Sequence, residues 1–396
     1  MTTTVRACTA VLAALALTLT ACTGDTVTGE AKRAGIDVSA LDVGNYPTKP
    51  RDIGNANDLK QARIREGQRL AEFVAQSFEI DDRFSFTSGG GFHPRIITDA
   101  RALGGPGLIA NDTFNKVAKD LVAGYVTMGQ TTAKETDGSL LVNAVMMFPD
   151  EAAATTVAKQ LENDDFTYIK TNQPVQISKF PTAHAHWQPN VASIGSWYAH
   201  KRYVFFSHVY DHVGKPDLPA LTGLVEKTIA AQSRLVDEFE PTPADDLAKI
   251  PLDVDGILGR SLASDPKSKG GDIDGVWGPR AALNMMAKPV EAQKTFAEFG
   301  VDLTAFADGG VFRVKDQAAA RRLFEKWSTP SDGESSADVP RGLEHDGVCF
   351  APPNSEIRKV WRCNVTFGRY VAQVVALNQQ EVAQKASAQY ALLGAE

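Results

Sequence analysis

The chain has 396 residues, with 48 acidic and 41 basic side chains and a formal net charge of −7. Hydrophobic residues make up 43% and charged residues 22%, which are ordinary values for globular proteins and exclude a largely disordered chain. The length predicts about two domains. The acidic balance argues against nucleic-acid binding, because that function relies on cationic side chains that neutralise phosphates.

The first residues have the pattern of an export signal. Arg6 precedes an apolar stretch that is too short to cross a bilayer as a stable helix, and residues 19–22 read LTAC, which looks like a bacterial lipobox. The pattern predicts a signal peptide over residues 1–21, a lipid on the Cys22 sulfur and a flexible tether over residues 22–40. An ordinary secretory signal with an incidental cysteine is the alternative.

Beyond the tether, hydrophobic periodicity and capping residues predict alternating helices and strands. Asn57 or Asp58 is expected to begin a helix that runs to about Phe78. Strands are then expected at 140–148, 197–199 and 203–209, with helices at 150–161 and 218–239. After a proline-rich boundary at 240–243, strands are expected at 310–314, 348–350 and within 360–377, with helices at 316–327 and after Asn378.

An internal repeat links the two halves of the chain. Residues 145–154 (VMMFPDEAAA) align with 311–320 (VFRVKDQAAA), and residues 201–204 (KRYV) align with 368–371 (GRYV). Because both matches have nearly the same offset and the same strand or helix context, they favour a tandem duplication.

The repeat sets the predicted fold class. We expect an α+β protein with two tandem related domains of ferredoxin-like type, each an antiparallel sheet with helices packed on one face. The predicted limits are 41–240 for the N-terminal α+β domain and 241–396 for the C-terminal α+β domain.

Two cysteines of the exported chain lie in the second half. Cys349 and Cys363 are 14 positions apart, in predicted strands that flank a loop. Outside the cytoplasm such a pair is expected to form a disulfide. A pair of free thiols and a metal site remain as alternatives, although only His345 is close enough in sequence to add a ligand.

Five of the seven histidines fall between His184 and His212, which raises the question of a metal site. His184 and His186 would share one face of a strand, as would His208 and His212. No carboxylate or cysteine completes a recognisable ligand set, so no metal or other cofactor is predicted. The alternative that we favour is a loop and a solvated sheet face.

The sequence lacks the common catalytic and phosphate-binding motifs. The sequence contains no nucleophile elbow and no phosphate-cradling loop. Residues 88–91 (SGGG) with His93 could present amides to an oxyanion, but no partnered nucleophile follows from the sequence. Asp253 and Asp272 begin short acidic turns that lack the later ligands of a calcium loop. No catalytic residue is therefore predicted.

Aromatic residues concentrate in the expected hairpins. The consecutive pair Phe205 and Phe206 must point to opposite faces of its strand. One face is expected to lie under helices, and the other could form a core between the halves or bind an apolar ligand. The core between the halves is the interpretation that we favour.

Taken together, these stretches resemble a family of uncharacterised lipoproteins from mycolic-acid actinomycetes. The segments that carry the resemblance are the lipobox at Cys22, residues 41–51 (LDVGNYPTKPR), 275–283 (GVWGPRAAL) and 362–372 (RCNVTFGRYVA). The resemblance implies a surface location and supports the disulfide in the second half. It implies no activity and no catalytic residues.

The sequence thus predicts a protein on the extracytoplasmic face of the cell membrane, whose membrane contact is the lipid at Cys22. We expect a non-catalytic protein that binds an envelope lipid, a glycan or another protein. The alternatives are a structural or assembly component of the envelope without a small ligand, and an enzyme of hydrolase type with an unrecognised site. Nucleic acid is not expected as a partner, and no protein partner is identified.

Overall fold

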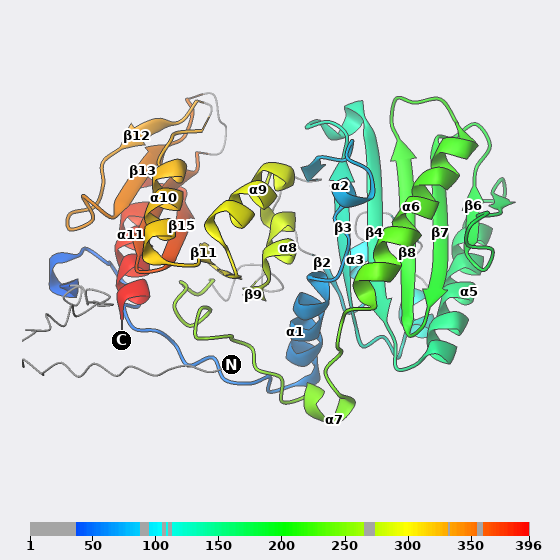
Figure 1. Ribbon diagram of the computed structural model, residues 1–396, viewed down its shortest axis with the longest axis horizontal. Coiled ribbons are helices and arrows are strands. Elements are labelled where there is room, and N and C mark those ends of the chain that lie inside the picture. The colour runs from blue at the N-terminus through cyan, green and yellow to red at the C-terminus, as the bar shows by residue number, and fades with distance from the viewer. Residues whose placement is uncertain are drawn as a thin grey trace, which may run out of the picture. The chain divides into compact units, whose positions relative to one another are not determined.

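Two antiparallel sheets organise the part of the chain that the computed structural model describes, which comprises residues 37–87, 95–104, 108–109, 113–264, 274–331, 333–354 and 359–395 (Figure 1). The signal peptide, Cys22, the 88–91 loop, His93 and Asp272 lie outside these residues. So does the predicted tether up to residue 36. Its last residues form a short 3-10 helix, η1 (Val38–Ala40), which the Asp37 side chain caps.

The first sheet has the strand order β1-β3-β4-β8-β7-β6-β5, with β2 also paired to β3. Its strands are β1 (Phe86–Thr87), β2 (Arg95–Ile97), β3 (Ala123–Gln130), β4 (Ser139–Met147), β5 (Gln173–Val175), β6 (His184–Trp187), β7 (Ser193–His200) and β8 (Tyr203–Asp211). The helices of this half are α1 (Leu59–Ala71), α2 (Ser77–Ile80), α3 (Arg101–Gly104), α4 (Phe114–Val117), η3 (Glu135–Asp137), α5 (Glu151–Tyr168), α6 (Leu218–Val236) and α7 (Ala244–Leu247).

The second sheet has the order β12-β13-β14-β15-β11-β10-β9. Its strands are β9 (Gly275–Trp277), β10 (Leu303–Phe306), β11 (Gly310–Arg313), β12 (Ser335–Ala337), β13 (Gly347–Ala351), β14 (Trp361–Phe367) and β15 (Tyr370–Ala376). Its helices are α8 (Pro279–Ala282), η4 (Leu283–Met285), α9 (Pro289–Phe299), α10 (Gln317–Trp327) and α11 (Gln379–Gly394). The α+β class with two antiparallel sheets is therefore confirmed.

The strand orders of the two sheets correspond strand by strand. The series β3-β4-β8-β7-β6-β5 in the first sheet matches β10-β11-β15-β14-β13-β12 in the second, with α5 and α10 after the equivalent strands β4 and β11. The register agrees as well, because Val145 pairs with Phe205 in one half and Val311 with Ala372 in the other. A shared topology with a shared register is what a duplicated domain would leave, so the structure supports the repeat.

The same hydrogen bond from an arginine side chain to a backbone carbonyl occurs in both halves, at the turn of the equivalent hairpins. Arg202 Nε donates to the carbonyl of Phe148 at 2.8 Å, and Arg369 Nε donates to that of Val314 at 2.9 Å. The residue before each arginine has a positive φ, 51° at Lys201 and 56° at Gly368. In the second half, glycine adopts this φ without steric strain. In the first half, lysine adopts it at a steric cost.

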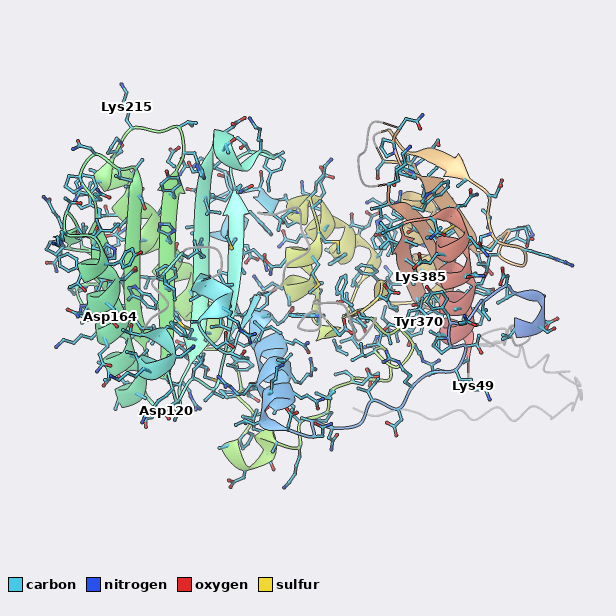
Figure 2. All side chains as sticks on the ribbon, turned by 180° about the vertical axis from the view of Figure 1, so that it is seen from behind. Lys49, Asp120, Asp164, Lys215, Tyr370 and Lys385 are labelled. Carbon is cyan, nitrogen blue, oxygen red and sulfur yellow. A yellow bond between two sulfur atoms is a disulfide. The ribbon has the colours of Figure 1, made fainter. Side chains whose placement is uncertain are left out.

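Helices lie on both faces of each sheet, so the prediction of helices on one face is wrong. In the first half, α5 packs on the face that carries Val142 and Ala144, whereas α6 packs on the face of Leu141. Figure 1 shows α6 in front of the first sheet, and Figure 2, seen from behind, brings α5 with Asp164 into view. The reason is the sequence of β4, which is buried on both faces and needs a cover on each.

The second half repeats this arrangement, with α10 and α11 on opposite faces. Phe324 of α10 shares a core with Phe312, and Val382 of α11 shares a core with Val311, its neighbour on the strand. Each pairing between described strands is antiparallel. The ferredoxin-like motif contains a split βαβ unit, whose two strands are parallel. Antiparallel pairings alone therefore do not establish the ferredoxin-like subclass.

Cys349 and Cys363 form a directly opposed pair of β13 and β14. A disulfide joins them, with Cα atoms 4.1 Å apart. The free-thiol and metal alternatives do not apply to this arrangement. The pair is buried in the α11-side core, together with Val365 and Val374.

Candidate functional site

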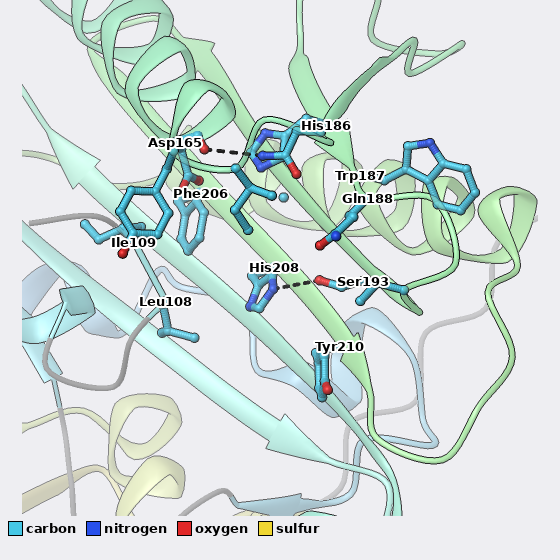
Figure 3. A pocket seen from close by; sticks show the side chains of 15 residues that line it. Leu108, Ile109, Asp165, His186, Trp187, Gln188, Ser193, Phe206, His208 and Tyr210 are labelled. Atoms are coloured by element: carbon cyan, nitrogen blue, oxygen red, sulfur yellow. Dashed lines mark hydrogen bonds between the residues drawn. The ribbon is translucent and has the colours of Figure 1, made fainter.

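A cavity lies on the α5 face of the first sheet. It has a volume of about 570 Å³, and strands β6, β7 and β8 form its floor while the C-terminal end of α5 forms one wall (Figure 3). Its size lies within the range of roughly 300–1,000 Å³ that is typical of small-molecule sites. The lining residues are Leu108, Ile109, Asp165, Tyr168, Ile169, Asn172, His186, Trp187, Gln188, Val191, Ser193, Gly195, Phe206, His208 and Tyr210.

Gly195 keeps the floor of this cavity open. It pairs with His208 on one side and with His186 on the other. A Cβ at this position would lie 3.3 Å from Cε1 of His186 and 3.8 Å from a carboxylate oxygen of Asp165. Any larger residue would therefore press on His186 and fill the space above the strand.

A buried acid–base cluster stands beside the glycine. His186 Nδ1 lies 3.0 Å from Glu162 Oε1, and Asp165 Oδ2 accepts a hydrogen bond from Trp197 Nε1 at 3.2 Å. Burial works against the imidazolium, but the hydrogen bond and charge of Glu162 outweigh it and raise the pKa of His186. Burial also raises the pKa of Asp165. Each of these two shifts favours the protonated form of its group.

Glu162 adds an unused acceptor to this cluster. Burial raises the pKa of Glu162, although His186 acts in the opposite direction. Its Oε2 atom is buried and has no hydrogen-bond partner among the described residues. Buried polar groups are normally satisfied, so this oxygen leaves one acceptor of the cluster free.

His208 and Ser193 form a second polar pair on the floor. His208 Nε2 lies 3.0 Å from Ser193 Oγ, as the dashed line in Figure 3 marks. Burial lowers the pKa of His208 to about 4, so its ring is neutral at physiological pH. Nδ1 of the same ring is shielded from solvent and has no partner among the described residues.

An aromatic row runs along β8 next to this pair. The ring of His208 lies between those of Phe206 and Tyr210, with centroid distances of 6.3 and 6.5 Å. Tyr168, at the end of α5, is 74% exposed at the rim. The indole of Trp187 points away from His208 and Ser193 in Figure 3 and packs against the core of the opposite face.

The second half fills the equivalent position. Arg362 occupies the place of Gly195, because it pairs with Phe350 as Gly195 pairs with His186. Its guanidinium stacks on the Phe350 ring, 4.2 Å from the centroid, and binds Glu334 at 2.5 Å. Where the first half has a polar cavity, the second therefore has a closed ion pair over an aromatic ring.

The remaining sequence-based candidates serve structural roles. His184 shares a strand face with His186 but is exposed, and no group of three potential metal ligands occurs in the described residues. The Asp253 carboxylate accepts backbone N–H groups of Val254, Leu258 and Gly259, which stabilises a turn. Phe205 and Phe206 are both buried in core clusters, on opposite faces of the sheet, and Phe206 also lines the α5-face cavity.

Two family models match the chain, one after the other. Residues 53–252 match the model described as domain of unknown function (DUF7373) N-terminal, and residues 257–396 match its C-terminal counterpart. The chain belongs to the DUF7373 family. All the cavity-lining residues fall within the N-terminal DUF7373 region. No curated protein matches the sequence.

Solved structures that are similar to part of this DUF7373 protein include one extracellular domain. The extracellular domain of PknH from Mycobacterium tuberculosis has 9% sequence identity and a TM-score of 0.31, and the match covers 44% of this chain and 97% of that one. None of the helices in the described part of the DUF7373 chain combines the length and hydropathy that a membrane crossing requires.

Sequence reasoning missed most of this site. Glu162 and Asp165 are three positions apart on a helix, a spacing that also describes a solvated helix surface. The sequence does not indicate that Gly195 opens a cavity, because this depends on its neighbours on the adjacent strands. The sequence singled out the histidines by their number and spacing and Phe206 by its place in an aromatic pair, and of these His186, His208 and Phe206 line the cavity.

Proposed function

We propose that this protein binds a small, neutral, hydroxyl-rich ligand of saccharide type in the α5-face cavity. The observation that carries the proposal is a cavity of about 570 Å³ that an open glycine position creates in one half only. Following the sequence pattern at Cys22, we place the protein on the extracytoplasmic face of the cell membrane, held there by lipid. It acts as a binding protein and not as an enzyme.

The lining supports this ligand class because it mixes donors, acceptors and aromatic rings. Amide groups of Asn172 and Gln188, the Ser193 hydroxyl and the Asp165 carboxylate face the cavity or line its wall. Sugar hydroxyls both donate and accept hydrogen bonds, so they satisfy such a mixed set. The Tyr210 ring offers an apolar surface to the C–H face of a sugar ring.

An acyl chain fits this cavity less well. It would cover Asp165, Gln188 and Ser193 without replacing their hydrogen bonds to water, which costs roughly 1–3 kcal/mol for each group. Among the ligands expected from the sequence, the glycan is therefore the one that the cavity chemistry favours.

The equivalence of Gly195 and Arg362 provides the main test. The substitution Gly195→Arg should fill the cavity as Arg362 fills the second half, and it should abolish saccharide binding. Binding would be measured by calorimetry and saturation-transfer NMR with mono- and disaccharides of glucose, galactose, mannose and N-acetylglucosamine. Gly223→Arg is the matched control, since a Cβ at Gly223 of α6 meets no atom within 4 Å.

A second variant, with a smaller change, tests the proposal if Gly195→Arg does not fold. Gln188→Ala removes one side-chain amide without crowding the floor, and it should weaken binding roughly three- to tenfold. If no saccharide binds the wild-type protein, or if both variants bind as the wild type does, the proposal is wrong.

A second candidate rests on the Ser193–His208 pair. A neutral histidine 3.0 Å from a serine hydroxyl could accept its proton during hydrolysis, although Nδ1 lacks the acid that orients it in known triads. A fluorophosphonate probe tests this directly. Labelling of Ser193 that disappears in His208→Gln would favour a hydrolase, and absence of labelling would favour the binding protein.

A further inference from the structure

A second cavity, of about 480 Å³, lies beside α1 at the segment that follows the first half. It is separate from the α5-face cavity and shares no lining residue with it. One wall comes from α1, and the other comes from residues 242–254, including the end of α7. The lining residues are Arg65, Arg69, Thr242, Asp246, Lys249, Ile250, Pro251 and Val254.

Arg65 brings a buried positive charge to this cavity. It is only 8% exposed. Its guanidinium donates to the carbonyl oxygens of Pro251 and Val276 at 3.2 and 2.7 Å and to Gln68 Oε1 at 3.3 Å. These partners are all neutral, and no ion pair joins Arg65 to a described carboxylate. The carboxylates of Glu66 and Asp253 act on this charge through space, but no described carboxylate forms an ion pair with the buried guanidinium, so the site favours an anion.

Arg69 adds a second positive charge one helical turn away. Two like charges four positions apart on a helix repel each other. Arg69 forms an ion pair with Glu66 at 2.7 Å, and the Thr242 backbone N–H and hydroxyl also donate to Glu66. The Glu66 carboxylate is therefore already engaged by Arg69 and Thr242. Burial, with Arg69 as a second cause, lowers the pKa of Arg65 to about 10.

Lys249 and Asp246 complete the charged lining. Both side chains are exposed, and neither forms an ion pair with a described residue. The lining thus holds three cationic side chains and one carboxylate, set among Ile250, Pro251 and Val254. Apolar neighbours lower the local dielectric constant and strengthen the attraction for an anion.

From this arrangement we infer that the α1 cavity binds a small oxyanion, either a phosphate group or a carboxylate group of a ligand. Arg65 supplies a fixed positive charge that neutral carbonyls hold in place. Lys249, on the other wall, supplies a movable ammonium that closes on the anion. Asp246 opposes binding and sets its strength.

The test uses the whole exported chain with inorganic phosphate in one series and acetate in another, both against sodium chloride of equal ionic strength. Calorimetry should show saturable, single-site binding of at least one of the two anions, and the preferred anion identifies the group. Lys249→Gln should weaken that binding about tenfold. Asp246→Asn should strengthen it severalfold, because it removes the opposing carboxylate.

Lys294→Gln is the matched control, since Lys294 is an exposed lysine of α9 outside the cavity. It should leave binding unchanged. The inference is overturned if both anions act like chloride, or if Lys249→Gln and Asp246→Asn bind as the wild type does. Because Gly195→Arg does not touch this cavity, it should retain anion binding, so the two proposals fail independently.

Discussion

At the level of single residues, Gly195 and Arg362 show how one position can separate two copies of a fold. Both occupy the same place in the register, opposite His208 and Val375 respectively. With glycine the sheet floor stays free and polar groups face a cavity. With arginine the guanidinium fills that space and binds Glu334. The residue at this position therefore distinguishes the open floor of one copy from the filled one of the other.

His208 predicts a specific pH dependence of stability. Its pKa in the folded protein is about 4, below the value of about 6.5 in an unfolded chain. Between these values the unfolded state binds more protons, so the free energy of unfolding should rise as pH increases from about 4 to 6.5. Above that range, the contribution of His208 is constant.

Other groups at the cavity change the stability with pH in the opposite direction. The measurement therefore compares the wild type with a variant that lacks His208. The raised pKa values of His186 and Asp165 reduce stability as pH rises through their own ranges. Denaturant unfolding of the wild type and of His208→Gln from pH 4 to 7 isolates the His208 contribution. The stability difference between wild type and variant should grow with pH up to about 6.5, and a constant difference would contradict the prediction.

Cys22 carries the prediction on membrane attachment. In Cys22→Ala the lipid acceptor is lost, so the protein should move from the detergent phase to the aqueous phase in detergent partitioning. Stable anchoring needs two acyl chains. Because the variant has lost the lipid, the shift should be nearly complete. The wild type is the control. A variant that stays in the detergent phase with its signal peptide removed would show that the lipid is not the anchor.

At the level of elements, the two hairpins that carry Cys349 and Cys363 in one half and Ala185 and Ser196 in the other are equivalent. Cys349 pairs with Cys363 across β13 and β14, and Ala185 pairs with Ser196 across β6 and β7. The disulfide of the second half therefore indicates that the first half has room for one at the same register position.

The double substitution Ala185→Cys and Ser196→Cys should form a disulfide after export. It should raise the free energy of unfolding by roughly 2–3 kcal/mol, because it closes a short loop in the unfolded chain. It also removes the Ser196 hydroxyl, which is buried without a partner. Peptide mapping by mass spectrometry and denaturant unfolding with and without reductant are the measurements. Free thiols at both positions would contradict the equivalence.

Elements with strong local signals could be predicted from the sequence. The helices α5, α6, α10 and α11 each begin after an Asp or Asn whose side chain accepts a backbone N–H, and these capping residues are visible in the sequence. Strand β3 has no such signal, because its small residues Ala123 and Gly124 interrupt the alternation. The expected helix from Asp58 ends at Ala71 instead of near Phe78, where a separate short helix, α2, begins at Ser77.

The placement of helices on both faces could have been read from β4, whose residues are apolar on either face. The candidate site could not be predicted in the same way. It depends on tertiary contacts that bring Glu162 of α5 to His186 of β6 and leave Gly195 uncovered. Such contacts join residues 24 or more positions apart, and a single sequence holds no record of them.

At the level of the whole molecule, residues 41–51 pack with the second half, although they precede the first half in the chain. Leu41 belongs to the α11-side core, and the hydroxyl of Tyr46 donates to Glu381 of α11. Asp42 accepts a hydrogen bond from Gln384, and Arg51 donates to the carbonyl of Leu258. The segment that carries part of the family resemblance is therefore a component of the second core.

Removal of residues 41–51 should destabilise the second half more than the first. The loss of Leu41 alone removes a buried side chain from the α11-side core, which costs about 2 kcal/mol or more. Hydrogen exchange of backbone amides should accelerate in α11 and β15 while β4 and β8 stay protected. Leu59→Ala serves as the control, because Leu59 is 60% exposed. Equal acceleration in both sheets would contradict the prediction.

The same segment has a consequence for the order in which the protein folds. Residues 41–51 leave the ribosome early, yet α11, which Tyr46 and Asp42 contact, is synthesised more than 300 positions later. Contacts of such long sequence separation form slowly, because the chain must close a large loop first. The core of the second half is thus completed late in folding. Until then its apolar surface is exposed to aggregation.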